Sequence, residues 1–279
     1  LELALNRGGD QVAVKIDDQV NFYGAKQEAI PKDNKVDIRI KSEELQDLFL
    51  RSSNIFVIAH KNTDTDGFGA SFGLYKMAEA LGKEVYIIQD TVDTTVTKIM
   101  DNIRTDYVEL KDKIITPKKA LSLANDKSLL MVVDCQSKTQ VMLNEKQLGS
   151  FKNIGIIDHH RKNDEGTIPN PIYYYSEPAA SSSVEVIFTL LEFSEYELII
   201  TDSEATWMLL GIVVDTNNFV YRSSNTTFEI AALLAKKQAN MGRVKEYLKE
   251  KKEEKLLRNK LIGDIEVYRD NIAIATQTD

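Results

Sequence analysis

Histidines and aspartates gather in a few short segments of this sequence. Only three histidines occur in 279 residues. One begins residues 60–66 (HKNTDTD), and the other two are adjacent in residues 158–160 (DHH). Both segments come directly after an apolar run, as do the isolated Asp134 and Asp215. Imidazole and carboxylate groups bind metals and transfer protons, so this grouping predicts one shared chemical site.

A cluster of carboxylates is unfavourable without cations, because like charges at short distance raise one another's pKa and destabilise the fold. A mixed aspartate and histidine donor set without cysteine favours Mn²⁺ or a similar cation over a structural zinc. Two metals about 3.5–4 Å apart, bridged by one carboxylate, are a standard arrangement for phosphoryl transfer. The candidate ligands are His60, Asp64, Asp66, Asp134, His159 and Asp215, with Asp158 nearby.

Four short apolar runs alternate with helical stretches and are expected to position these residues. Continuous apolar strands separated by helices are typical of a parallel sheet with helices on both faces, which predicts an α/β fold. Ligands bind beyond the carboxyl ends of such strands, so the acidic and histidine segments should converge on one crevice. The predicted strands cover about residues 54–59, 84–89, 128–134 and 153–158.

The flanking parts of the chain are predicted to form helices and small hairpins. Residues 11–17 and 20–23 alternate as a hairpin, and a short strand at 36–40 precedes a helix at about 42–51. After residue 178 the periodicity predicts helices and then a second strand pair. These helices cover about 180–193, 202–214, 226–240 and 242–260, and the strand pair covers 265–268 and 272–275.

Simpler roles compete with the chemical ones at several positions. An aspartate at a strand end often caps the next helix. Asp158 is expected to orient His160 or to cap the turn rather than to bind a metal. The small residues of 67–71 (GFGAS) favour close helix packing over anion binding. Ser181 and Ser182 form either an N-cap run or a phosphate contact, and both alternatives stay open.

Composition excludes several classes of protein. The formal net charge is −8, which argues against a protein that coats nucleic acid, since such proteins need a basic surface. A single cysteine excludes a disulfide framework and a thiolate metal site. We see neither a signal peptide nor an apolar run of about 18 residues, the length of a membrane span. The sequence is therefore expected to be soluble and to work in a reducing, cytoplasmic setting.

The four acidic and histidine segments, in this order, resemble the metal motifs of the DHH phosphoesterase family over about residues 50–240. The resemblance implies two Mn²⁺ ions per chain. It assigns one to His60, Asp64 and Asp134, and the other to Asp66, Asp134, His159 and Asp215, so that Asp134 bridges them. It also implies that His160 contacts the substrate phosphate or the leaving oxygen.

The flanks narrow the resemblance to GdpP-type cyclic-di-AMP phosphodiesterases. We expect residues 1–34 to be the C-terminal remnant of a degenerate GGDEF-like domain and residues 35–53 a connector. Residues 54–240 would form the DHH catalytic domain. Residues 241–279 would form a linker helix and the beginning of a truncated DHH-associated domain. The glycine-rich, histidine-ended motif with which that domain grips the nucleotide is absent from this sequence.

These features lead to one principal hypothesis and two alternatives. The principal hypothesis is a Mn²⁺-dependent two-metal phosphodiesterase that hydrolyses cyclic di-AMP to pApA, weakened here by the missing nucleotide-gripping domain. The alternatives are an exonuclease or short-oligonucleotide hydrolase of the same family, and a non-catalytic metal- and nucleotide-binding module. The resemblance also implies a full-length protein anchored on the cytoplasmic side of the bacterial membrane, without a stable nucleic-acid partner. It leaves a homodimer open.

Overall fold

The computed structural model of the chain describes residues 11–16, 19–24, 35–161, 166–250, 252–263, 265–268 and 272–274. The chain divides into two compact units, residues 1–240 and 241–279. Residues 1–10, the first part of the segment assigned to a GGDEF-like remnant, lie outside the described residues. The assignment of the flanking segments to particular domain types stays a prediction.

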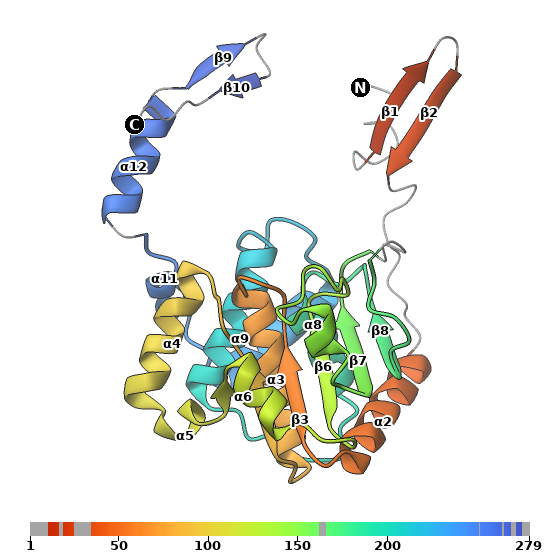
Figure 1. Ribbon diagram of the computed structural model, residues 1–279. Coiled ribbons are helices and arrows are strands. Elements are labelled where there is room, and N and C mark those ends of the chain that lie inside the picture. The colour runs from red at the N-terminus through yellow and green to blue at the C-terminus, as the bar shows by residue number, and fades with distance from the viewer. Residues whose placement is uncertain are drawn as a thin grey trace. The chain divides into compact units, whose positions relative to one another are not determined.

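A six-stranded parallel sheet forms the centre of the first unit (Figure 1). Its spatial order is β5-β4-β3-β6-β7-β8, so β3 and β6 lie in the middle. Ile55 of β3 pairs with Val85 of β4 on one side and with Leu129 of β6 on the other. The strands are β3 (Ile55–Ile58), β4 (Val85–Ile88), β5 (Ile114–Ile115), β6 (Leu129–Val133), β7 (Asn153–Asp158) and β8 (Tyr173–Ser176).

The four predicted core strands are confirmed, and two edge strands were missed. β5 contains only two residues, too few to stand out from the sequence as a strand. β8 reads YYYS, and in it Tyr173 and Tyr175 are buried while the residues between and after them are half-buried. An edge strand buries less apolar surface than a central one, so its apolar pattern is weaker.

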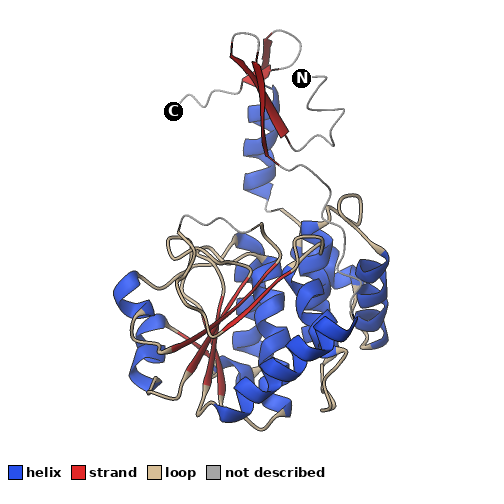
Figure 2. Cartoon of the chain, turned by 90° about the vertical axis from the view of Figure 1, so that its right-hand side faces the viewer, coloured by secondary structure: helices blue, strands red, loops and turns tan. Residues whose placement is uncertain are grey.

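Helices cover both faces of the sheet, as the apolar strands predicted (Figure 2). One face packs beneath α6 (Pro117–Leu123) and α7 (Glu145–Leu148), where Phe56, Ile58 and Leu130 share a buried cluster with Ala120 and Leu148. The other face is covered by α3 (Thr65–Ala80), which contacts β3, β4 and β6, and by α8 (Ser183–Leu191), which contacts β7. The α/β fold class is therefore confirmed.

Behind α3 lies α9 (Asp202–Asp215), followed by α10 (Asn225–Lys236). Trp207 of α9 is buried, with its ring edge-on to Phe68 and Phe72 of α3. Such aromatic pairs add about 0.5–1.5 kcal/mol each beyond the burial of their area. The contact joins α9 firmly to α3, and both helices contribute residues to the site described below.

The connector differs from its prediction. Residues 35–51 form a single helix, α2 (Lys35–Arg51), and the strand expected at residues 36–40 is part of that helix. The apolar side chains of Val36 and Ile40, which suggested a strand, are exposed. Ion pairs at helical spacing, such as Arg39 with Glu43, stabilise the first turns instead. The helix is anchored to α8 by the Ser42 hydroxyl, which donates to the Leu190 carbonyl at 2.7 Å.

The remaining elements of this unit are two helices and a hairpin. They are α4 (Thr94–Asp106), α5 (Val108–Lys111) and the hairpin of β1 (Gln11–Ile16) and β2 (Gln19–Gly24), in which Gln11 pairs with Gly24. The second unit contains α11 (Met241–Tyr247), α12 (Lys252–Gly263), β9 (Glu266–Tyr268) and β10 (Ile272–Ile274). The prediction of one helix over 242–260 was wrong, since two helices occupy this region. Within the described residues, none of the helices combines the length and apolar character needed to cross a bilayer.

Candidate metal centre

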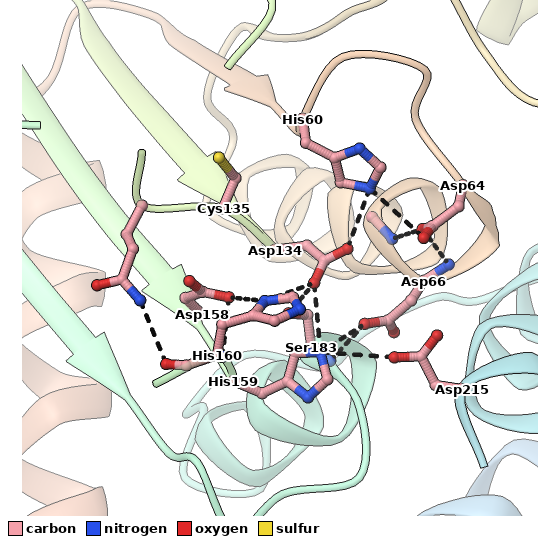
Figure 3. A network of polar contacts seen from close by, with 12 residues as sticks. His60, Asp64, Asp66, Asp134, Cys135, Asp158, His159, His160, Ser183 and Asp215 are labelled. Atoms are coloured by element: carbon pink, nitrogen blue, oxygen red, sulfur yellow. Dashed lines mark hydrogen bonds and ion pairs between the residues drawn. The ribbon is translucent and has the colours of Figure 1, made fainter. Parts of the chain in front are cut away.

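The carboxyl ends of three central strands supply most of the candidate ligands (Figure 3). His60 follows β3, Asp134 follows β6, and the segment of His159 follows β7. Asp134 has a positive φ of 55°, so the chain turns sharply directly after its strand. Asp215 arrives from elsewhere, as the last residue of α9. All six predicted ligands therefore meet at one edge of the sheet, as the topology requires.

A first cluster consists of His60, Asp64 and Asp134. The Nε2 atom of His60 lies 3.5 Å from Asp64 Oδ2 and 3.5 Å from Asp134 Oδ2. The other oxygen of Asp64, Oδ1, accepts hydrogen bonds from the backbone N–H groups of Asp66 and Gly67 and so caps α3. Asp64 thus caps α3 with one oxygen and turns the other toward His60, so the two roles considered from the sequence do not exclude each other.

A second cluster consists of Asp66, His159 and Asp215. The Nε2 atom of His159 lies 3.7 Å from Asp66 Oδ2 and 3.5 Å from Asp215 Oδ2. It also lies 3.4 Å from Asp134 Oδ1. Asp134 therefore turns one oxygen toward each cluster, which is the geometry of a bridging carboxylate.

The N-terminus of α8 holds the second cluster in place. The backbone N–H groups of Ser183 and Val184 donate to the two oxygens of Asp66, at 2.6 and 3.0 Å. The Ser183 hydroxyl donates to Asp134 Oδ1 at 3.0 Å. A helix N-terminus favours negative charge, so this contact stabilises the buried carboxylate of Asp66. Sequence reasoning missed this role of Ser183, although the serine run at the start of the helix pointed to the region.

Burial and mutual repulsion perturb the acids of the cluster. Burial raises the pKa of Asp66 well above its usual range, and the charges of Asp134 and Asp215 add to the effect. Burial likewise raises the pKa of Asp215 to about 7. Burial opposes ionisation of Asp134 as well, but contacts with His159 and His60 outweigh it and lower the pKa of Asp134. Added positive charge would lower the raised pKa values of these acids and so stabilise their ionised forms.

The pKa values of the histidines are raised as well, which for an imidazole favours the charged form. Contacts with Asp134 and Asp64 raise the pKa of His60 to about 11. For His159, burial lowers the pKa, but Asp134 and Asp66 overcome it and raise the pKa to about 9. The Nδ1 atom of His60 lies 2.7 Å from the Lys61 carbonyl, which orients Nε2 toward the carboxylates as in metal-binding histidines. With oxygen and imidazole donors only, these residues fit divalent cations of the Mn²⁺ class.

His160 also lies beside Asp134, with its Nδ1 3.7 Å from Asp134 Oδ1, and forms a third group with Asp134 and His159 that could hold a metal ion. Its Nδ1 lies 2.7 Å from Asp158 Oδ1, and the hydrogen bond raises the pKa of His160. More than half of the His160 side chain is exposed, whereas Asp158 is fully buried. In Figure 3 both residues lie on the side of Asp134 away from Asp64 and Asp215. The structure thus supports the role considered for Asp158, which is to orient His160.

Ser181 and Ser182 are buried and already bonded. Ser182 is the N-cap of α8 and accepts from the Glu185 N–H, while the Ser181 hydroxyl donates to the Glu185 carboxylate. Neither residue lines the cavity described next. This geometry favours the N-cap alternative over the phosphate contact. Residues 67–71 likewise serve packing, because a Cβ at Gly69 would lie 3.1 Å from Met208 Cα.

A cavity of about 800 Å³ opens over the cluster. Ligand pockets of proteins commonly enclose about 300–1,000 Å³, so the cavity can hold a nucleotide-sized molecule. Its wall contains acids of both metal clusters and His160, and beyond them mainly polar and basic side chains. The further lining residues are Lys61, Cys135, Gln136, Ser137, Thr139, Gln140, Arg161 and Thr167.

Known proteins are similar to this chain in sequence and in fold. The chain is 39% identical over 279 residues to the cyclic-di-AMP phosphodiesterase GdpP of Bacillus subtilis (strain 168), covering 99% of this chain and 42% of that protein. It therefore spans less than half the length of that relative. It is 26% identical over 177 residues to a probable manganese-dependent inorganic pyrophosphatase of Enterococcus faecalis, covering 63% of this chain and 52% of that protein.

A solved structure shares the fold. An exopolyphosphatase-related protein from Bacteroides fragilis superposes with a TM-score of 0.70 at 19% identity, covering 83% of this chain and 67% of that chain. The model of the DHH family, N-terminal domain, matches residues 54–212, which is more than half of the chain. The match includes every candidate ligand except Asp215, which lies three residues beyond its end. The chain belongs to the DHH family.

Proposed function

We propose that this protein is a two-metal phosphodiesterase that uses Mn²⁺ to hydrolyse cyclic di-AMP to pApA. The observation that carries the proposal is Asp134, whose two oxygens face two separate clusters of histidine and aspartate. The 39% identity to a cyclic-di-AMP phosphodiesterase supports the choice of substrate. The likeness to a manganese-dependent pyrophosphatase supports the choice of metal.

Six residues would hold the two cations. His60, Asp64 and Asp134 would bind one, and Asp66, Asp134, His159 and Asp215 the other. When bound, such a pair of cations supplies Lewis-acid stabilisation of the phosphate charge and an activated water at neutral pH. The N-terminus of α8 keeps the Asp66 carboxylate aimed at the site through the N–H groups of Ser183 and Val184.

We further propose that His160 contacts the substrate and donates a proton to it. Because Asp158 fixes its Nδ1 side and raises its pKa, the imidazolium form is favoured and its Nε2 side is left for the substrate. The exposed ring lines the cavity, where it can donate to a phosphate oxygen or to the oxygen that leaves on cleavage of the 3′,5′-phosphodiester. This step needs no further residue as proton donor.

Incubation with Mn²⁺ and either cyclic di-AMP or single-stranded DNA, followed by chromatography of the products, tests the proposal. We expect pApA from cyclic di-AMP. Release of mononucleotides from DNA would favour the exonuclease alternative, which the net charge of −8 disfavours. Metal binding without any product would favour the non-catalytic alternative.

Matched aspartate variants separate the ligand role from a general loss of charge. Asp134→Ala should lose both cations in a direct count of bound Mn²⁺, since it removes the bridging ligand. Asp101→Ala, on the exposed face of α4 beside Arg104, should retain both. Retention of Mn²⁺ by Asp134→Ala would refute the ligand assignment.

The membrane attachment and dimerisation of the natural protein stay predictions, which cell fractionation and mass measurement in solution would check.

A further inference from the structure

Two basic side chains stand beside the acidic cluster in the cavity wall. Lys61 and Arg161 are the permanently cationic residues among those that line the cavity within the described part of the chain. Each comes directly after a histidine of the site, Lys61 after His60 and Arg161 after His160. They therefore belong to the same loops as the chemical groups, although neither belongs to a metal cluster.

Lys61 is held at the cavity wall by main-chain contacts. Its backbone N–H donates to the Gln140 carbonyl at 2.8 Å, and its ammonium donates to the Thr139 carbonyl at 2.9 Å. An ammonium group has three donors, so one contact leaves two for a ligand. The position of the charge is thus fixed, and its capacity to bind an anion is retained.

Arg161 is positioned through the buried side chain of Gln136. The Gln136 amide nitrogen donates to the carbonyls of His160 and Arg161, each at 3.2 Å. Its amide oxygen accepts from the Tyr174 hydroxyl at 3.1 Å. These bonds hold the turn after β7 to the segment after β6. Gln136 therefore acts as a positioning residue for both His160 and Arg161.

Within the described part of the chain, neither Lys61 nor Arg161 forms an ion pair, and the ammonium of Lys61 bonds to a carbonyl instead. The described acids of the cavity are engaged with imidazoles, as Asp134 is with His60 and His159. Two cationic groups that face a polar cavity, without an ion pair to a described acid, favour an anionic ligand group.

We propose that Lys61 and Arg161 form a second phosphate subsite, which binds the phosphodiester that is not being cleaved. The proposal rests on the proposed function, because a cyclic dinucleotide carries two phosphodiesters and only one can lie at Asp134. The guanidinium of Arg161 and the ammonium of Lys61 then pair with the other, and the enzyme selects substrates with two phosphates over those with one.

Two substrates separate this subsite from the metal centre. Cyclic di-AMP has two phosphodiesters, whereas bis(p-nitrophenyl) phosphate has one. In the Mn²⁺-loaded chain, Arg161→Gln and Lys61→Gln should each lower the ratio of kcat/KM for cyclic di-AMP to that for bis(p-nitrophenyl) phosphate. The expected decrease is about tenfold for each charge-assisted hydrogen bond lost.

Further variants control for indirect effects. Lys138→Gln removes an exposed lysine that pairs with Glu145 and does not line the cavity, so the ratio should stay as in the wild type. Gln136→Leu should lower the ratio as Arg161→Gln does, because the turn that carries Arg161 loses its hydrogen bonds. A merely structural role of Gln136 would reduce both activities equally and leave the ratio unchanged.

Every outcome bears on the subsite. An equal loss on both substrates leaves the ratio unchanged and would overturn the proposal, because the basic pair would then bind the scissile phosphate. Full activity of both variants on both substrates would overturn it as well. If the wild type hydrolyses neither substrate, the proposed function fails separately, and the Kd of the Mn²⁺-loaded chain for cyclic di-AMP decides the subsite. A Kd that does not weaken in Arg161→Gln and Lys61→Gln would then exclude it.

Discussion

Gly211 in the middle of α9 offers a direct test of how packing builds the metal centre. A Cβ at this position would lie 2.9 Å from the Thr65 carbonyl oxygen and 3.0 Å from Asp66 Cα. Both atoms belong to the backbone of α3, which cannot yield by a change of rotamer. Gly211→Ala should therefore push α9, which carries Asp215, away from Asp66.

The expected magnitude combines two opposing terms. Overpacking of this kind costs about 1–3 kcal/mol. The better helix propensity of alanine returns up to about 1 kcal/mol. The net loss of unfolding free energy should thus reach about 2 kcal/mol, which corresponds to a decrease in Tm of about 4–8 °C for a domain of this size.

A thermal melt and a Mn²⁺ titration together form the assay. Gly263→Ala, the same substitution at the end of α12, is the matched control, because a Cβ there would meet no atom within 4 Å. We expect Gly211→Ala to lower both Tm and the affinity of the Asp66 and Asp215 cluster, and Gly263→Ala to leave the affinity as it is. A Gly211→Ala protein with the Tm and Mn²⁺ affinity of the wild type would refute the reasoning.

Three further predictions concern protons and caps. Mn²⁺ affinity should rise with pH, because His60 and His159, with pKa values raised to about 11 and about 9, must lose protons to bind a cation. Calorimetry near pH 7.5 in buffers of different ionisation enthalpy should count at least two protons released, since the raised pKa of Asp66 adds to those of the two histidines, and a count of zero would contradict the assignment. Asp158→Asn removes the acceptor that raises the pKa of His160, so the alkaline limb of the kcat profile should move to lower pH; an unmoved limb would argue against His160 as the proton donor. Ser182→Ala removes the N-cap of α8 and should cost about 1 kcal/mol, or about 2–4 °C in Tm, without a change in KM; a raised KM would instead indicate a phosphate contact.

The candidate site was largely predictable because chain direction fixes where strand ends lie. His60, Asp134 and Asp158 each follow or end a strongly apolar run, and the carboxyl ends of parallel strands share one edge of the sheet. The order of these segments along the chain also carried the family resemblance, which the match of the DHH family over residues 54–212 confirms.

Elements with weak local patterns were not predictable in the same way. Residues 36–40 are helical instead of forming the predicted strand. The reason is that Leu45 and Phe49, further along the same helix α2, are buried and fix the structure of the whole segment. The edge strand β5 forms because Ile114 and Ile115 pair with β4, and a two-residue segment has no periodicity of its own.

The sequence by itself determined the strand-end residues, the donor types and hence the chemistry, because these depend on residue identity and on periodicity within single elements. Only the tertiary structure decided how the donors are held. Asp66 receives its two hydrogen bonds from Ser183 and Val184, more than a hundred positions away in the chain. Such contacts arise when α8 and α9 pack on α3, and no local pattern encodes which helix N-terminus will meet which buried carboxylate.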